Sequence, residues 1–162
     1  MKNVLFGFLL LFYLKIEAQT DTKLYNPSAN AQNDIALIIK RAKVEKKNVL
    51  IQAGGNWCSW CIEFNRFCKT DGQIDSMLNK DYIIYHLNYS PENKNLQLLA
   101  KYGYPQRFGF PVFLVLDENG NRIHTQNSSY LEQGRSYNKH KVMEFLEQWN
   151  KKAIDPLAYK NF

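Results

Sequence analysis

The feature that most constrains this chain is a pair of cysteines at a predicted strand-to-helix junction. Residues 48–53 form an apolar run typical of a buried strand, and Gly-Gly-Asn at 54–56 ends it. The motif Trp-Cys-Ser-Trp-Cys follows at once at 57–61 and opens a helical segment. A sulfur at a helix start lies over unpaired backbone N–H groups, at the positive end of the helix dipole. Both effects favour the thiolate, so the placement predicts a reactive Cys58.

The spacing predicts different roles for the two thiols. Cys58 is expected to be the exposed nucleophile, and Cys61, one turn into the helix, the less accessible thiol that resolves the mixed disulfide. An inert disulfide and half of a zinc site are the alternatives. Zinc would need about two further ligands, and the sequence offers no second CxxC, only the scattered His86, His124 and His140. Neither a metal nor a bound cofactor is expected, because the cysteine pair itself carries the electrons.

The remaining segments alternate between helical and strand-like patterns. Apolar residues recur at helical spacing at 35–42, from Cys58 onward, and at 74–78, 96–102 and 142–149. Strands are expected at 48–53, 82–87 and 111–116, the last followed by a hairpin turn at 117–120. We also expect a short strand at 24–25, a helix cap at Asn33 or Asp34, and a final helix ended by Pro156. This order predicts an α/β fold with a mixed central sheet and helices on both faces.

The first 18 residues have the pattern of an export signal. A short positive region at 1–3 precedes an apolar run at 4–14, which spans about half of the ~20 residues that a membrane helix needs. Ala18 supplies a small residue at the expected cleavage site. We therefore expect export to the periplasm or secretion, and no stable membrane insertion after cleavage. An N-terminal core helix is the alternative reading.

The charge pattern argues against a nucleic-acid partner. The formal net charge is +6, but the Lys and Arg residues are spread along the 162-residue chain. Nucleic-acid binding proteins gather such residues on one face or stripe. The hydrophobic fraction of 45% is enough for one domain with a real core.

Two segments together resemble the thioredoxin-like proteins. They are VLIQAGGNWCSWC at 49–61 and GFPVFLVLD at 109–117. The WCxWC form resembles exported bacterial members of that family. The resemblance implies a thioredoxin-like fold, a cis Pro111 against the active-site disulfide, and Phe110 as its substrate-facing neighbour. Trp57 and Trp60 are expected to form an apolar rim around the site.

Two positions depart from the family pattern. Thioredoxins carry a buried aspartate six residues before the first cysteine, and here that residue is Gln52, which cannot titrate. Water or another group such as Glu63 would then have to take the proton of the resolving thiol. Ser59-Trp60 replaces the Gly-Pro pair of thioredoxin, so the direction of electron flow does not follow from the motif.

Cys68 is the third cysteine and lies on the same helical face as Cys61. Two helical turns separate them by about 10.5 Å, beyond the ~7 Å between Cα atoms that a disulfide allows. We expect Cys68 to be a buried core residue rather than a regulatory thiol.

These observations predict four segments: a signal peptide at 1–18, a polar lead-in at 19–33, a thioredoxin-like domain at 34–153 and a tail at 154–162. The leading hypothesis is an exported thiol–disulfide oxidoreductase, a reductase rather than an oxidase. It would act on disulfide-containing proteins and draw electrons from a membrane donor. A non-catalytic binding or chaperone module is the alternative, with Gln52 as its best support, and metal delivery through the two thiols is a weaker third.

Overall fold

A four-stranded mixed sheet forms the centre of the protein, whose computed structural model describes residues 23–160. The strands are β1 (Asn48–Gly54), β2 (Tyr82–Asn88), β3 (Val112–Leu116) and β4 (Arg122–Asn127), in the order β2-β1-β3-β4. β1 runs parallel to β2 and antiparallel to β3, and β3 pairs antiparallel with β4. The predicted mixed sheet is confirmed. The predicted signal peptide at 1–18 lies outside the described residues.

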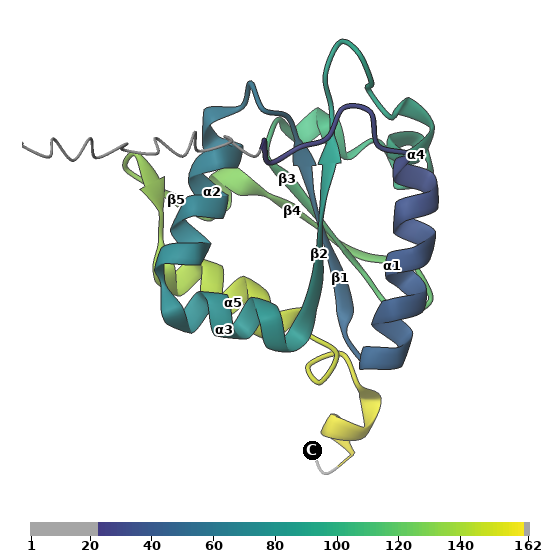
Figure 1. Ribbon diagram of the computed structural model, residues 1–162. Coiled ribbons are helices and arrows are strands. Elements are labelled where there is room, and N and C mark those ends of the chain that lie inside the picture. The colour runs from purple at the N-terminus through teal and green to yellow at the C-terminus, as the bar shows by residue number, and fades with distance from the viewer. Residues whose placement is uncertain (1–22, 161–162) are drawn as a thin grey trace, which may run out of the picture.

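Helices cover both faces of this sheet (Figure 1). One face is covered by α1 (Ala31–Glu45) and the short α4 (Leu96–Lys101), and the other by α2 (Ser59–Thr70), α3 (Gly72–Asp81) and α5 (Lys139–Gln148). The smaller elements are the 3-10 turns η1 (Pro105–Phe108), η2 (Ser128–Tyr130) and η3 (Pro156–Tyr159), and a hairpin of β5 (Glu132–Gln133) and β6 (Ser136–Tyr137). The hairpin packs beside α2.

The side chains of β1 alternate between two separate apolar cores. Val49, Ile51 and Ala53 belong to the core under α1, while Leu50 belongs to the core under α2, α3 and α5. Every residue of β1 is buried, which explains why its sequence reads as an uninterrupted apolar run rather than as an alternating one. Asn48 and Gln52 are the two buried polar residues of the strand. Gln52 lies where β1 approaches the cysteine pair.

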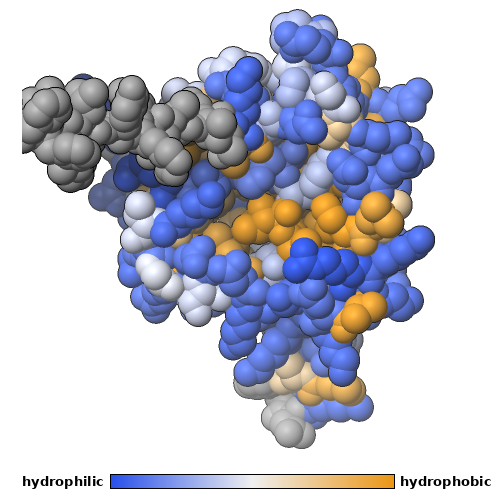
Figure 2. All heavy atoms as spheres, viewed as in Figure 1, coloured by the Kyte–Doolittle hydropathy of each residue, from blue (hydrophilic) through white to orange (hydrophobic). Residues whose placement is uncertain are grey.

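An apolar band crosses the face of the molecule on which β2 forms the sheet edge (Figure 2). Large apolar side chains exposed on β2 and α1 are Ile84, Leu37 and Val44. None of these three residues lies within the cysteine motif at 57–61.

The N-terminal predictions need correction. Leu24 and Tyr25 form bends rather than a strand, because the backbone of Tyr25 is paired with a side chain instead of a neighbouring strand. Helix α1 begins at Ala31 and is capped by Asn30, whose side chain accepts from the backbone N–H of Asn33. The predicted caps at Asn33 and Asp34 are wrong. The predicted domain start at residue 34 falls inside α1.

The predicted end of the last helix is also wrong. α5 ends at Gln148, and the carbonyl of the following Trp149 accepts a hydrogen bond from the Asn48 side chain rather than from a further turn of helix. Pro156 instead begins the 3-10 turn η3. Proline suits the first position of a helix, where its missing N–H would have no partner.

Candidate active site

The cysteine pair lies at the N-terminal end of α2, as predicted. Cys58 is the N-cap residue, and its Sγ accepts a hydrogen bond from the backbone N–H of Cys61 at 3.2 Å. The two cysteines are joined in a disulfide with a Cα–Cα distance of 5.2 Å. The sulfur that would become the nucleophile is therefore held against a backbone donor and the positive end of the helix dipole.

The two cysteines differ in exposure in the predicted order, but Cys58 is not an exposed residue. It retains 5% of its accessible surface, and Cys61 retains none. Tyr25 is buried with them, and Leu24 and Phe110 pack against this small cluster. In the disulfide form the lead-in segment and the loop before β3 therefore enclose both sulfur atoms.

Two glycines between β1 and the motif allow this close packing. A Cβ on Gly54 would lie 2.4 Å from Cys61 Sγ, and a Cβ on Gly55 would lie 2.3 Å from Trp57 Nε1. Real Cβ atoms do not come so close to other heavy atoms. Glycine is thus needed at 54 and 55 because neighbouring atoms leave no room for a Cβ. The backbone conformation there is one that other residues can adopt.

The tryptophans of the motif occupy different environments. Trp57 is 58% exposed, and its Nε1 donates to the Tyr89 carbonyl at 2.7 Å. Phe110 packs edge-on against the Trp57 ring, with ring centroids 5.6 Å apart. Trp60 is half-buried and lies edge-on to Tyr137 at 5.5 Å. Trp57 is thus exposed beside the disulfide, whereas Trp60 is largely a packing residue beside the α2 core.

The Phe110–Pro111 peptide bond is cis, as the resemblance implied. Pro111 is buried directly before β3, and Phe110 belongs to the cluster around the disulfide. Tyr104 and Phe108, in the preceding loop, are both exposed. The aromatic surface next to the disulfide thus comes from the helix start and from this loop.

The side-chain nitrogen of Gln52 donates two hydrogen bonds. Its Nε2 donates to the Cys61 carbonyl at 2.9 Å and to the Tyr25 hydroxyl at 2.8 Å. Sequence reasoning placed Tyr25 in a polar lead-in and missed its role in the site. The available signal was a pair of apolar residues, Leu24-Tyr25, inside an otherwise polar stretch.

The ionisable groups near the pair have shifted pKa values. Burial raises the pKa of the Tyr25 hydroxyl well above its usual range. The rings of His86 and Tyr25 are nearly perpendicular, with centroids 5.6 Å apart. Burial, with a smaller effect of Lys69, lowers the pKa of His86 to about 4. Both groups are therefore neutral near pH 7.

Glu63, the predicted alternative proton acceptor, is bound elsewhere. Its carboxylate accepts from Arg66 at 2.7 Å and from the Ser136 hydroxyl at 2.5 Å. The hydrogen bond from Arg66, followed by that from Ser136, lowers its pKa. Its hydrogen bonds within residues 23–160 thus tie α2 to the β5–β6 hairpin, and none reaches a cysteine.

Cys68 is a free, buried core thiol, as predicted. Burial, with smaller effects of Asp71 and Asp75, raises its pKa to about 12. It is therefore a neutral thiol near pH 7 and shares none of the activation available to Cys58.

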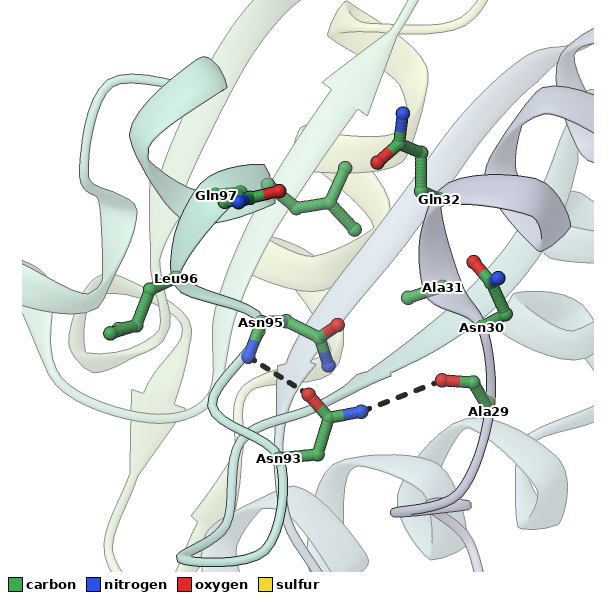
Figure 3. A pocket seen from close by; sticks show the side chains of 9 residues that line it. Ala29, Asn30, Ala31, Gln32, Asn93, Asn95, Leu96 and Gln97 are labelled. Atoms are coloured by element: carbon green, nitrogen blue, oxygen red, sulfur yellow. Dashed lines mark hydrogen bonds between the residues drawn. The ribbon is translucent and has the colours of Figure 1, made fainter.

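Other parts of the described chain offer less chemistry. Residues 23–160 contain no group of three or more His, Cys, Asp or Glu side chains arranged to hold a metal ion. Within the same residues, every helix is too short or too polar to cross a bilayer. A 350 Å³ pocket lies between the starts of α1 and α4, where Asn93 donates to the Ala29 carbonyl (Figure 3). This hydrogen bond ties the lead-in to the loop after β2. No cysteine is among the residues that line the pocket.

The fold, the disulfide at the helix start and the neighbouring cis-proline together define a thioredoxin-like thiol–disulfide oxidoreductase. A family profile described as a thioredoxin-like domain matches residues 35–135. The chain therefore belongs to the thioredoxin-like family.

Two curated relatives are similar to this chain over a single segment of their own length. The thiol:disulfide interchange protein DsbD of Colwellia psychrerythraea is 22% identical over 103 residues, which cover 63% of this chain and 16% of that protein. The protein of the same name from Photorhabdus laumondii is 28% identical over 96 residues, covering 58% and 16%. The chain thus matches only a small part of the length of these relatives.

Solved structures show the same fold. The disulphide isomerase of Xylella fastidiosa Temecula1 superposes with a TM-score of 0.68 at 21% identity, covering 77% of this chain and 95% of that one. The oxidised C-terminal domain of Neisseria meningitidis DsbD superposes with a TM-score of 0.54 at 20% identity, covering 75% and 97%. The predicted thioredoxin-like fold is confirmed.

Proposed function

We propose that the protein is exported and reduces disulfide bonds in other proteins, with Cys58 as nucleophile and Cys61 as resolving thiol. One observation carries the proposal: the Cys58 sulfur caps a helix beside the exposed ring of Trp57. A substrate chain reaching Trp57 would thus meet the one cysteine of the pair that retains some exposure.

The proposed reaction transfers two electrons to the substrate. The Cys58 thiolate attacks a substrate disulfide, forms a mixed disulfide and releases one substrate thiolate. Cys61 then loses its proton and attacks the Cys58 sulfur. The Cys58–Cys61 disulfide forms, and the second substrate sulfur leaves as a thiolate. Water carries the Cys61 proton to a leaving thiolate, so the substrate gains two electrons and the enzyme pair loses two.

The reducing direction is supported by the packing around the pair. A dithiol becomes a stronger oxidant when its reduced form is stabilised, chiefly through the thiolate. Here Leu24, Trp60 and Phe110 pack around the two sulfurs. Such an apolar enclosure disfavours a thiolate and opposes the effect of the helix N-terminus. This apolar packing supports the disulfide form, and hence the proposed role as a reductant.

The substrate surface is proposed from four residues around the disulfide. Trp57 and Phe110 would contact the substrate chain through their rings, and the backbone at Pro111 would pair with it. Trp60 would support this surface from its half-buried position. A 370 Å³ hollow beside Trp57, lined partly by Asn56 and Glu92, extends the surface toward the loop after β2.

The electron donor is proposed to lie in the membrane. The pattern of residues 1–18 supports export, and an oxidising compartment lacks the soluble reductants of the cytoplasm. The relatives named thiol:disulfide interchange proteins support the same exchange chemistry. A membrane protein with a dithiol facing that compartment would return two electrons to the Cys58–Cys61 disulfide.

An equilibrium redox titration in glutathione buffers tests the direction. We expect a potential near about −270 mV, as in thioredoxin, and a value near about −120 mV would contradict the reductase. Reduction of a protein disulfide by wild type and by Cys58→Ser tests the nucleophile. Equal rates would reject the enzyme. Unchanged partner binding by the Cys58→Ser, Cys61→Ser double variant would then support a binding module.

Export is tested by expressing the full chain and a chain that lacks residues 1–18 in a Gram-negative host. We expect the full chain in the periplasmic fraction and the shortened chain in the cytoplasm. Equal distribution of the two would contradict the proposed signal.

A further inference from the structure

Tyr25 reaches the cysteine pair from a distant part of the sequence. Its side chain is fully buried and clusters with Cys58 and Cys61. Two hydrogen bonds fix its backbone to the loop before the motif. The Tyr25 N–H donates to Asn56 Oδ1 at 3.0 Å, and Asn56 Nδ2 donates back to the Tyr25 carbonyl at 2.8 Å. The tyrosine is thus attached to the same loop that positions Cys58.

The hydrogen bonds of Gln52 determine what the tyrosine hydroxyl can do. The Cys61 carbonyl can only accept, so the amide nitrogen of Gln52, and not its oxygen, must face it. The same nitrogen lies 2.8 Å from the Tyr25 oxygen. Tyr25 therefore accepts from Gln52, and its own proton is left to donate in another direction.

The Cys61 sulfur and the Tyr25 hydroxyl oxygen lie in the same buried cluster, on either side of Gly54. A single Cβ placed on Gly54 would be 2.4 Å from Cys61 Sγ and 2.9 Å from the Tyr25 oxygen. The Cys61 sulfur and the Tyr25 oxygen thus both lie beside the position that a Gly54 side chain would occupy. Within residues 23–160, Gln52 is the hydrogen-bond partner that the structure gives to the Tyr25 oxygen. The sulfur is the neighbouring atom that gains acceptor strength when the disulfide opens.

We propose that Tyr25 donates a hydrogen bond to the Cys61 sulfur once the pair is reduced, and so stabilises the resolving thiolate. The inference rests on the proposed function, in which Cys61 must become a thiolate to attack Cys58. Gln52 is a positioning residue in this proposal. Its hydrogen bonds orient the Tyr25 hydroxyl and reach the Cys61 carbonyl, not a sulfur.

Tyr25 acts in this proposal as a donor and not as a base. Burial raises the pKa of its hydroxyl, so it keeps its proton while Cys61 ionises. The other titratable groups packed around it are Cys58, His86 from β2 and Tyr137 from β6. His86 is neutral near pH 7, and burial raises the pKa of Tyr137. Neither competes as a charged group for the Cys61 thiolate.

The test follows the ionisation of Cys61 directly. Cysteine labelled with ¹³C at Cβ reports each thiol by its chemical shift during a pH titration of the reduced protein. A Cys58→Ser background removes the coupled titration of the second thiol. Tyr25→Phe keeps the ring and removes the hydroxyl. The matched control is Tyr82→Phe, a buried tyrosine whose hydroxyl donates to the Leu146 carbonyl away from the site.

We expect Tyr25→Phe to lower the acid dissociation constant of Cys61 about tenfold, since a hydrogen bond to a charged group is lost. Tyr82→Phe should leave the constant unchanged. A folded Tyr25→Phe variant with an unchanged Cys61 titration would overturn the proposal. So would an equal change in both variants, because it would then reflect general loss of packing.

A second variant keeps the test decisive if Tyr25→Phe does not fold. 3-Fluorotyrosine introduced at position 25 retains the ring and the hydroxyl but donates more strongly. Cys61 should then ionise at lower pH than with tyrosine, and an unchanged or higher midpoint would overturn the proposal. Neither titration uses a substrate. Failure of the wild type to reduce protein disulfides would therefore count against the proposed function and leave the role of Tyr25 measurable.

Discussion

The two ends of α2 carry the same residue type in opposite chemical states. At the N-terminal end, the Cys58 sulfur accepts a backbone N–H and is joined to Cys61. In the last turn, Cys68 is a free thiol enclosed by the apolar core, and its pKa is raised to about 12. The same helix thus positions Cys58 for disulfide exchange and Cys68 for packing in the core.

The difference shows that position on a helix decides cysteine chemistry. The first turn has unpaired N–H groups that stabilise a negative sulfur. By the last turn the N–H groups are all used within the helix, and the carbonyl end of the dipole disfavours a thiolate. The neighbouring Asp71 and Asp75 act in the same direction on Cys68.

The largest expected effect is on activity. Cys58→Ser removes the attacking sulfur, so disulfide reduction should fall by at least about a thousandfold. Cys68→Ala removes only a packing atom and should keep the rate within about twofold while lowering stability by about 1 kcal/mol. Reduction of a protein disulfide, followed with each variant, gives the comparison. A large activity loss in Cys68→Ala would show that both ends of α2 take part in exchange.

The second expected effect is on thiol labelling. At pH 7.5 the raised pKa of Cys68 leaves its thiolate fraction on the order of a thousandfold below that of a free cysteine with pKa ~8.5. Alkylation of the native reduced protein should therefore modify Cys58 early and Cys68 only after unfolding. Peptide mass spectrometry over time measures both rates. Rapid native labelling of Cys68 would contradict its burial.

The third effect is on stability and compares Gly54, the last residue of β1 before the cysteine motif, with Gly72, the first residue of α3 after α2. Gly54→Ala would place a methyl group 2.4 Å from Cys61 Sγ and should cost about 2–3 kcal/mol through overpacking. Gly72→Ala, just beyond the C-terminal end, meets nothing within 4 Å and should be neutral or stabilise by up to about 1 kcal/mol. Urea denaturation measures both. Equal effects would mean that the space beside Cys61 is not tightly packed.

The smallest effect concerns the pH dependence of stability near the redox end. His86 has a folded pKa of about 4, lowered first by burial and then by Lys69, against about 6.5 when unfolded. The unfolded chain therefore takes up the proton first, so this contribution to stability is present above pH 6.5 and is lost as the pH falls toward 4. His86→Gln should reduce the loss between neutral pH and about pH 5 by about 2 kcal/mol.

Urea denaturation at a series of pH values measures the effect of His86→Gln, with His140→Gln as control. His140 lies on the surface of α5 with a side-chain exposure of 83%, so it serves as the exposed histidine for comparison. Identical slopes for His86→Gln and wild type would show that His86 is solvated in the folded protein.

Local sequence patterns predicted most of the fold, because the elements carry their own signals. The apolar run of β1, the turn at 117–120 and the cysteine at the start of α2 were all predicted at or near their observed places. Errors occurred where one side chain decided a boundary. Asn30 begins α1 earlier than expected, and α5 ends well before Pro156.

The sequence by itself determined the chemistry of the motif: two thiols at a strand-to-helix junction, where unpaired N–H groups favour a thiolate at Cys58. That inference needs only the local chain, since the helix start and the sulfur are neighbours in sequence. The tertiary structure alone decided what surrounds the pair. It brings Tyr25 to Gln52 and Cys61 and ties Glu63 to Ser136. Contacts between distant segments follow from packing the whole chain, and no local pattern encodes them.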